Sequence, residues 1–215
     1  MALKLNGSTD GSVSIDAPAD TSPTGTDVTL TLPTSAGSSG QYLQTNGSGG
    51  LSWQTVTDTT TNLTRMTSVA TTSGTAIDFA IPSNVRKIIV IFDQVSLNAD
   101  QSLRVQIGTG GSPLTSGYIG RCNYQSSGSA SEANYSGGFD IRHYDNRFDC
   151  TGTMTISNIT GNTWISTHSM SSSGWSTIYM GSGVASLSGE LDLIRVTATS
   201  GGTFDNGQVN VMYEV

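Results

Sequence analysis

The stretch VRKIIVIFDQVSL, from Val85 to Leu97, decides the fold class of this 215-residue chain. Its centre, IIVIF, is apolar at every position, so an extended strand here has an apolar side chain on both faces and is expected to lie in the middle of a sheet. The following stretch, SLRVQIG (Ser102 to Gly108), alternates instead. Its pattern predicts one buried and one exposed face. Buried positions are expected at Leu103, Val105 and Ile107, and exposed positions at Arg104 and Gln106.

Further strand patterns continue at short, regular intervals to the end of the chain. They are GYIGRCNYQ (Gly117 to Gln125), GFDIRHY (Gly138 to Tyr144), TMTIS (Thr153 to Ser157), TWISTHSM (Thr163 to Met170), STIYM (Ser176 to Met180), ELDLIRVTA (Glu190 to Ala198) and QVNVMYEV (Gln208 to Val215). No window carries apolar residues at helical spacing without a Gly, Pro or Thr/Ser run that breaks it. This part of the chain, residues 65–215, is therefore predicted to form an antiparallel β-sandwich or jelly roll that is large enough to fold alone.

The first 56 residues form a separate β module in this interpretation. SVSIDAP (Ser12 to Pro18) and DVTLTLP (Asp27 to Pro33) alternate and end at a proline, while QYLQT and LSWQTV flank the turn NGSGG (Asn46 to Gly50) and indicate a hairpin. Residues 57–64 have no pattern and are assigned to a linker. Because a module this small has too few large side chains to close its own core, its apolar faces are expected to be covered by neighbouring chains.

Composition argues against several classes of partner. Only 12% of the residues are charged and the formal net charge is −7, so the surface repels phosphate backbones and direct nucleic-acid binding is not expected. No apolar run has the length of a membrane span, so membrane insertion is not expected. The start lacks a secretory signal, so assembly is expected to take place in a cytoplasm. Cys122 and Cys150 are interpreted as reduced small hydrophobes, with a late disulfide between them as the alternative.

Catalytic and metal-binding signatures are missing, and the chain is predicted not to be an enzyme and to bind no cofactor. Glu190 and Asp192 resemble a glycosidase pair, but such a pair is more often a solvated strand face. In DIRHYDNRFD (Asp140 to Asp149) the oxygens of Asp145, Asn146 and Asp149 suit Ca²⁺. Their spacing matches no EF-hand and two arginines partly neutralise them, so no metal site is predicted there.

Four side chains are candidates for a contact surface. Tyr135 and Trp175 lie in glycine- and serine-rich stretches, and His143 and Tyr144 lie in the one stretch where several ionisable groups crowd together. Aromatic side chains among Gly, Ser and Asn are typical of adaptable recognition loops. Trp164 and Tyr179, in contrast, fall within clear strand patterns and are expected to be packed.

The first 56 residues resemble a module of phage fibre and virion proteins, especially those of cyanophages and marine phages. The resemblance rests on TLP (Thr31 to Pro33) followed by small residues, then GQYLQTNGSG (Gly40 to Gly49) and Trp53. The second region is similar to a phage tail-protein domain in its opening TAIDFAIPSNVRKIIVIFDQVS, in SLRVQIGTGG and in its closing TFDNGQVNVMYE. The family implies trimers about a shared axis, with the amino-terminal part attached to the particle and the carboxy-terminal part facing outward.

These observations together predict a virion protein assembled in the host cytoplasm, namely a homotrimeric tail fibre or spike that docks on other phage virion proteins and contacts host cell-surface glycans. A capsid head fibre or decoration protein with the same fold is the close alternative. A polysaccharide depolymerase is the rival from another class, and it lacks a recognisable catalytic constellation. A bacterial adhesin is disfavoured by the missing export signal.

Overall fold

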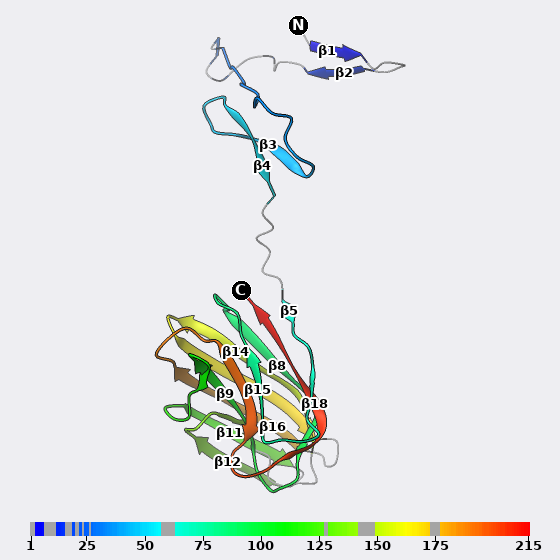
Figure 1. Cartoon of the computed structure of the whole chain (residues 1–215). Helices are drawn as coiled ribbons and strands as arrows, with labels where there is room; N and C mark the ends of the chain where they lie inside the picture. Colours follow the sequence, from blue (N-terminus) through cyan, green and yellow to red (C-terminus); the bar gives the residue numbers. More distant parts are fainter. Residues whose placement is uncertain are drawn as a thin grey trace. The chain divides into compact units, whose positions relative to one another are not determined.

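The computed structural model describes residues 3–6, 12–15, 19, 22, 24–25, 27–56, 63–126, 129–141, 149–172 and 177–215. Within these residues every regular element is a β-strand, and the strands pair antiparallel (Figure 1). The contacts divide the chain into two units, Met1–Thr60 and Thr61–Val215. The prediction of an all-β protein, with a small N-terminal module and a larger C-terminal β-sandwich, is confirmed.

The N-terminal unit contains two separate hairpins. The first pairs β1 (Leu3–Asn6) with β2 (Ser12–Ile15), and the second pairs β3 (Gln41–Thr45) with β4 (Leu51–Thr55). The predicted strand in DVTLTLP does not form: the segment 27–33 makes only an isolated parallel bridge between Thr31 and Gly50. An alternating pattern supplies a face to bury but no partner strand, and within the described residues no second strand lies along this segment.

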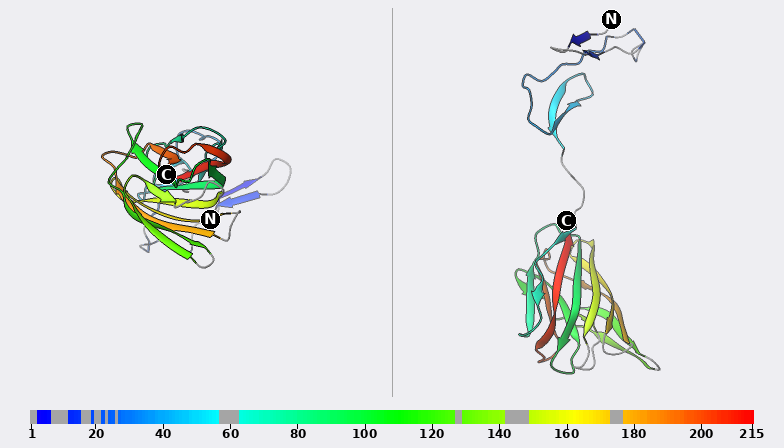
Figure 2. Two further views of the ribbon diagram at one scale, coloured as in Figure 1. Left: turned by 90° about the horizontal axis from the view of Figure 1, so that it is seen from below. Right: turned by 90° about the vertical axis from the view of Figure 1, so that its right-hand side faces the viewer.

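The C-terminal unit is a sandwich of two sheets (Figure 2). The nine strands of the large sheet are β5 (Thr64–Arg65), β6 (Val69–Ala70), β8 (Lys87–Leu97), β11 (Ile119–Ser126), β12 (Ser129–Tyr135), β14 (Cys150–Thr160), β15 (Thr163–Ser172), β16 (Thr177–Ser186) and β18 (Phe204–Glu214). The five strands of the small sheet are β7 (Ala76–Ala80), β9 (Leu103–Thr109), β10 (Ser112–Pro113), β13 (Phe139–Ile141) and β17 (Leu193–Ala198). The order in the large sheet is β12-β11-β16-β15-β14-β8-β18-β5, with β6 also on β18.

The core lies between the two sheets and is built from alternating positions. From the large sheet, β8 contributes Ile88, Val90 and Phe92, and it lies between β14 and β18 as its all-apolar pattern predicts. From the small sheet, β9 contributes three residues that are fully buried, as predicted: Leu103, Val105 and Ile107. The inward faces of both sheets therefore form one continuous hydrophobic cluster.

The predicted exposure of Arg104 and Gln106 is wrong, because the segment 137–140, which leads into β13, contacts both side chains. Gln106 is buried and donates its Nε2 to the carbonyl of Gly137 at 2.8 Å. Arg104 faces its cross-strand partner Asp140, donating from Nε to Oδ1 at 2.6 Å and from NH2 to Oδ2 at 2.9 Å. A long polar side chain on this strand is thus held by a partner from a distant part of the sequence.

The strand register defines two ends of the sandwich. The chain comes in at Thr64, which pairs with Tyr213 at the end of β18. At the opposite end Ser126 pairs with both Ser129 and Thr177, and Thr177 also pairs with Ser172. We call this opposite end the distal end of the C-terminal unit.

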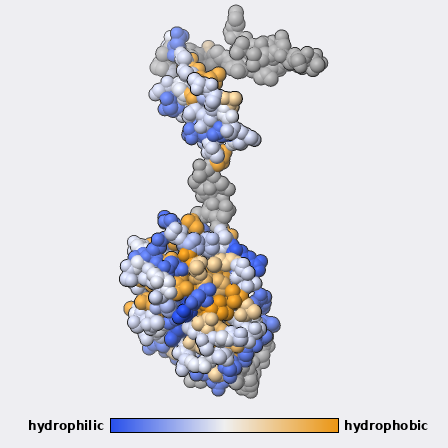
Figure 3. Space-filling view, viewed as in Figure 1, coloured by the Kyte–Doolittle hydropathy of each residue, from blue (hydrophilic) through white to orange (hydrophobic). Residues whose placement is uncertain are grey.

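The face of the C-terminal unit that Figure 3 shows is largely pale, with an orange hydrophobic patch beside a blue hydrophilic one. This matches a chain whose polarity comes from Ser, Thr, Asn and Gly more than from charged groups. A search of the described residues finds no helix that is both long enough and apolar enough to span a bilayer.

Candidate functional site

The turn between β3 and β4 is held by one side chain and two glycines. The Asn46 Oδ1 accepts hydrogen bonds from the amides of Ser48 at 2.8 Å and Gly50 at 3.0 Å. Gly49 has a φ of 85°, and a Cβ there would lie 2.2 Å from the carbonyl oxygen of Thr29. The glycine therefore lets the segment 27–33 approach the hairpin closely.

Two backbone hydrogen bonds then fix this segment beside β4. The Thr31 amide donates to the carbonyl of Gly49 at 2.8 Å, and the Leu51 amide donates to the carbonyl of Thr31 at 2.9 Å. Further along, the Trp53 indole Nε1 donates to the Ser35 carbonyl at 2.7 Å and the ring lies against Gly37, where a Cβ would come within 2.6 Å. The TLP, small-residue and Trp pattern is thus one local structure.

This local structure leaves several of its apolar side chains exposed. Side chains alternate about the Thr31 bridge, so Leu30 and Leu32 lie on the face that also carries Leu51, Trp53 and its cross-strand partner Leu43. We call these five residues the N-terminal apolar face. Leu30 is 61% exposed and Leu32 is 67% exposed. Orange residues are visible on the surface of this unit in Figure 3.

No side chain of residues 27–56 falls in the buried class. A folded segment normally removes its leucines from water, and full burial of one leucine stabilises by roughly 1.5–3 kcal/mol. The N-terminal apolar face is therefore exposed apolar surface, and its coverage by neighbouring chains stays a prediction.

The described strand ends that flank three of the four predicted contact residues in the sequence lie at the distal end. Residues 142–148 follow β13 and precede β14, and residues 173–176 connect β15 to β16. Ile141, Cys150, Ser172 and Thr177, which lie close to these stretches in the sequence, all lie at the distal end by register. His143, Tyr144 and Trp175 themselves lie outside the described residues.

The predicted exposure of Tyr135 is wrong: its side chain is only 6% exposed. Tyr135 ends β12 opposite Gly120, and its ring lies over Gly120 and Gly183, where added Cβ atoms would come within 2.3 Å of it. The two glycines leave room that the aromatic ring fills on the inner face of the sheet, and burial raises the pKa of the phenol to about 12. Trp164 and Tyr179 are packed, as predicted.

Sequence reasoning missed β12 because its residues are typical of a loop. The weak signal was the alternation of Ser131, Ala133 and Tyr135 with the more polar Glu132 and Asn134, which matches the burial seen along the strand. Glycine and serine on both sides obscured this period of two.

The carboxylates of Glu190 and Asp192 accept hydrogen bonds from backbone amides of neighbouring turns. The Glu190 Oε1 accepts the Asn84 amide at 2.5 Å, and the Asp192 carboxylate accepts the Gly111 amide at 3.1 Å. Both precede β17, so the expected solvated strand face is instead a pair of turn contacts. No group of three His, Cys, Asp or Glu side chains that could hold a metal ion occurs in the described ranges. Asp145 and Asn146 lie outside those ranges.

His168 and the two cysteines are buried. Both ring nitrogens of His168 are buried, and no described group forms a hydrogen bond with them. Burial lowers the pKa of this imidazole to about 4. Cys122 and Cys150 are buried and form no disulfide with each other, and burial raises the pKa of the Cys150 thiol. A thiol in that form is a poor nucleophile.

Comparisons with protein-family models, with curated proteins and with solved structures find no match to this chain. Two structural features bear on function, namely the N-terminal apolar face and the described strand ends at the distal end.

Proposed function

We propose that this protein is a structural component of a phage virion, a homotrimeric tail fibre or spike. In this proposal the N-terminal unit joins the copies and docks on other virion proteins, and the C-terminal sandwich presents its distal end to the host surface. The observation that carries the proposal is the exposed N-terminal apolar face. A group of exposed leucines on so small a unit is typical of a surface that binds another chain.

The local structure of residues 27–56 supports the sequence resemblance. The residues that carry the resemblance also build the structure: Gly49 and Trp53 contact the segment 29–37, and Asn46 holds the turn of the hairpin. The pattern is thus more than a compositional likeness of Ser, Thr and Gly. A module built in this way suits repeated use as an adaptor between chains.

The topology supports a host-facing role for the distal end. The strand ends next to His143, Tyr144 and Trp175 in the sequence lie there, while Thr64, where the described part of the unit begins its strands, lies at the opposite end. Aromatic and imidazole groups in such connections suit shallow contacts with the hydroxyl groups of bacterial glycans. Three copies on one axis raise the effective concentration, so weak individual contacts give firm attachment.

Immunogold electron microscopy tests this proposal on intact particles. Antibodies raised against the purified chain are applied to phage particles from a lysate in which the chain is produced, with pre-absorbed antibody as the control. We expect gold at the tail of the particle. Gold over the capsid would contradict the tail assignment in favour of a head fibre or decoration protein, and particles free of gold would contradict a virion role altogether.

A further inference from the structure

The outer face of the large sheet changes character from one strand to the next. On β14 the outward positions are Thr151, Thr153, Thr155 and Ser157, which is the composition expected of a sheet face that meets water. On β11, β15 and β16 the same face instead carries large apolar side chains with high exposure. They are Ile119 at 74%, Ile178 at 49%, Ile165 at 41% and Met180 at 41%.

Three of the aliphatic side chains on this face form one continuous row. Val184 on β16 is the cross-strand partner of Ile119 on β11 and of Ile165 on β15. We call these three residues the aliphatic row. They line a depression of about 450 Å³ together with Thr167, Ser182 and Gly183. Such a depression can receive an aliphatic side chain of a partner, which is the arrangement found at the centre of protein interfaces.

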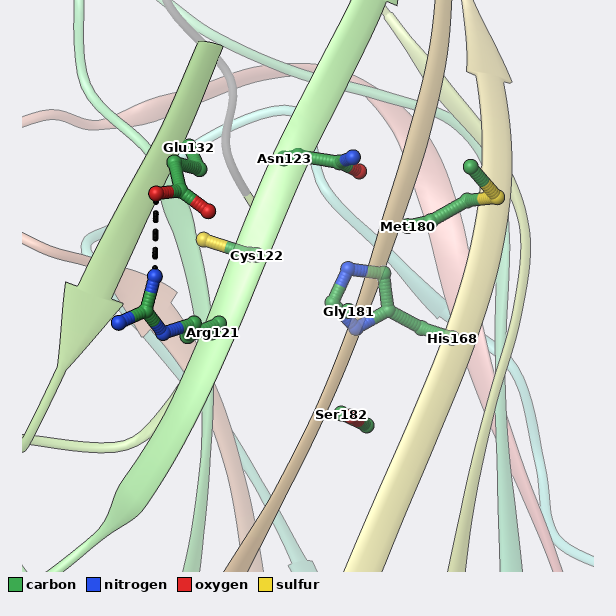
Figure 4. Close-up of a pocket in the computed structure, with 8 residues that line it drawn as sticks. All are labelled: Arg121, Cys122, Asn123, Glu132, His168, Met180, Gly181 and Ser182. Atoms are coloured by element: carbon green, nitrogen blue, oxygen red, sulfur yellow. Dashed lines mark hydrogen bonds and ion pairs between the residues drawn. The ribbon is translucent and has the colours of Figure 1, made fainter.

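Charge favours a second copy of the same chain as that partner. On the outward positions of β11, β12, β15 and β16 the described charges are Arg121 and Glu132, whose NH1 and Oε1 atoms lie 3.0 Å apart. Figure 4 shows this pair joined across β11 and β12. The face is therefore neutral, whereas the chain as a whole carries a formal charge of −7. Two copies repel each other over most of their surface but not here.

The place of the aliphatic row in the fold also favours a second copy. The row continues across the sheet through Ser157 and Lys87 to Glu214, next to the Tyr213 that pairs with Thr64. It thus lies at the end where the chain comes in from residues 57–62. An extended peptide of six residues spans at most about 20 Å, so copies joined through residues up to 56 hold these ends at high effective concentration.

We propose that the aliphatic row packs against the aliphatic rows of neighbouring copies and lines the symmetry axis of the oligomer. Residues on the axis of a cyclic oligomer contact the same residues of the other copies. A neutral apolar row can therefore pack against its copies there without charge repulsion. The inference rests on the proposed function in one respect, because it takes the copies to be joined through their N-terminal units.

Disulfide trapping in the full chain tests this inference. Val184→Cys places a thiol in the middle of the row, and oxidation with copper phenanthroline is followed by non-reducing electrophoresis. We expect about two of every three chains to run as covalent dimers, because three thiols around one axis form one bridge. Adding Ile119→Asp to Val184→Cys should reduce the dimer to the level of the wild type, whose two cysteines are buried.

Ala76→Cys is the matched control, because Ala76 is exposed on the other sheet, at the edge strand β7. It should give no dimer. Sedimentation equilibrium of the same samples separates the two proposals. An oligomer in which Val184→Cys does not cross-link would contradict this inference and would mean that something other than a second copy covers the row. It would still agree with association through the N-terminal unit. A monomer would contradict that association, on which both proposals depend.

Discussion

Replacement of Phe139 by alanine is expected to lower the free energy of unfolding by about 3–5 kcal/mol. Phe139 is fully buried on β13, with its ring edge-on to Tyr118 at 4.9 Å between centroids and to Tyr135 at 6.4 Å. β13 has only three residues and belongs to the small sheet. The Phe139 ring is therefore a main contact that holds this strand against the large sheet. Urea unfolding followed by circular dichroism at equal chain concentration measures the loss.

Ile178→Ala is the matched control, because Ile178 is about half exposed and its truncation opens no cavity. Its effect should stay within about 0.5 kcal/mol. A loss below about 1 kcal/mol for Phe139→Ala would contradict the packing described here. Since residues 142–148 follow β13 directly, the same substitution should also weaken any glycan contact made through His143 or Tyr144.

Acidification from pH 7 to pH 4 is expected to cost the wild-type chain about 3 kcal/mol of stability through His168 alone. The folded chain protonates this imidazole with a pKa of about 4, because burial disfavours the charged form, whereas the unfolded chain protonates it near 6.5. Between these values the unfolded state binds more protons. The contribution of His168 to stability is therefore complete above pH 6.5, is lost as the pH falls toward 4, and does not change further below that.

His168→Met isolates this contribution, because methionine fills a similar space and does not titrate. Carboxylates titrate in the same window in both proteins, so the measured quantity is the difference between their unfolding free energies at pH 7 and at pH 4.5. We expect the wild type to lose more by about 2–3 kcal/mol. Parallel pH profiles, or an NMR titration of His168 with a pKa near 6.5, would contradict its burial as a neutral side chain.

The sandwich was predictable from sequence because its strands carry strong periodic patterns. IIVIF is apolar throughout and lies inside the large sheet, and the alternation of Leu103, Val105 and Ile107 matches their complete burial. The β3–β4 hairpin was predictable from the NGSGG turn between two short strand patterns. In each case a local pattern and the global fold favour the same structure.

The failed expectations all concern residues whose environment is made by distant parts of the chain. Gln106 is buried and bonded to the Gly137 carbonyl, which precedes β13, and Tyr135 is buried over glycines on β11 and β16. DVTLTLP has a strand pattern but finds no partner strand along its length within the described residues. The aliphatic row could not be predicted, because Ile119, Val184 and Ile165 become neighbours only through the strand register.

Sedimentation equilibrium of the full chain at micromolar concentration tests most directly whether the N-terminal apolar face joins copies of this protein. Leu30→Asp combined with Leu32→Asp serves as the disrupting variant, and Thr34→Asp, which adds charge at an exposed position outside that face, as the control. We predict a mass about three times the chain mass of 22.3 kDa for the wild type and the control, and a monomer for the double variant. A wild-type chain that sediments at 22.3 kDa would contradict the account.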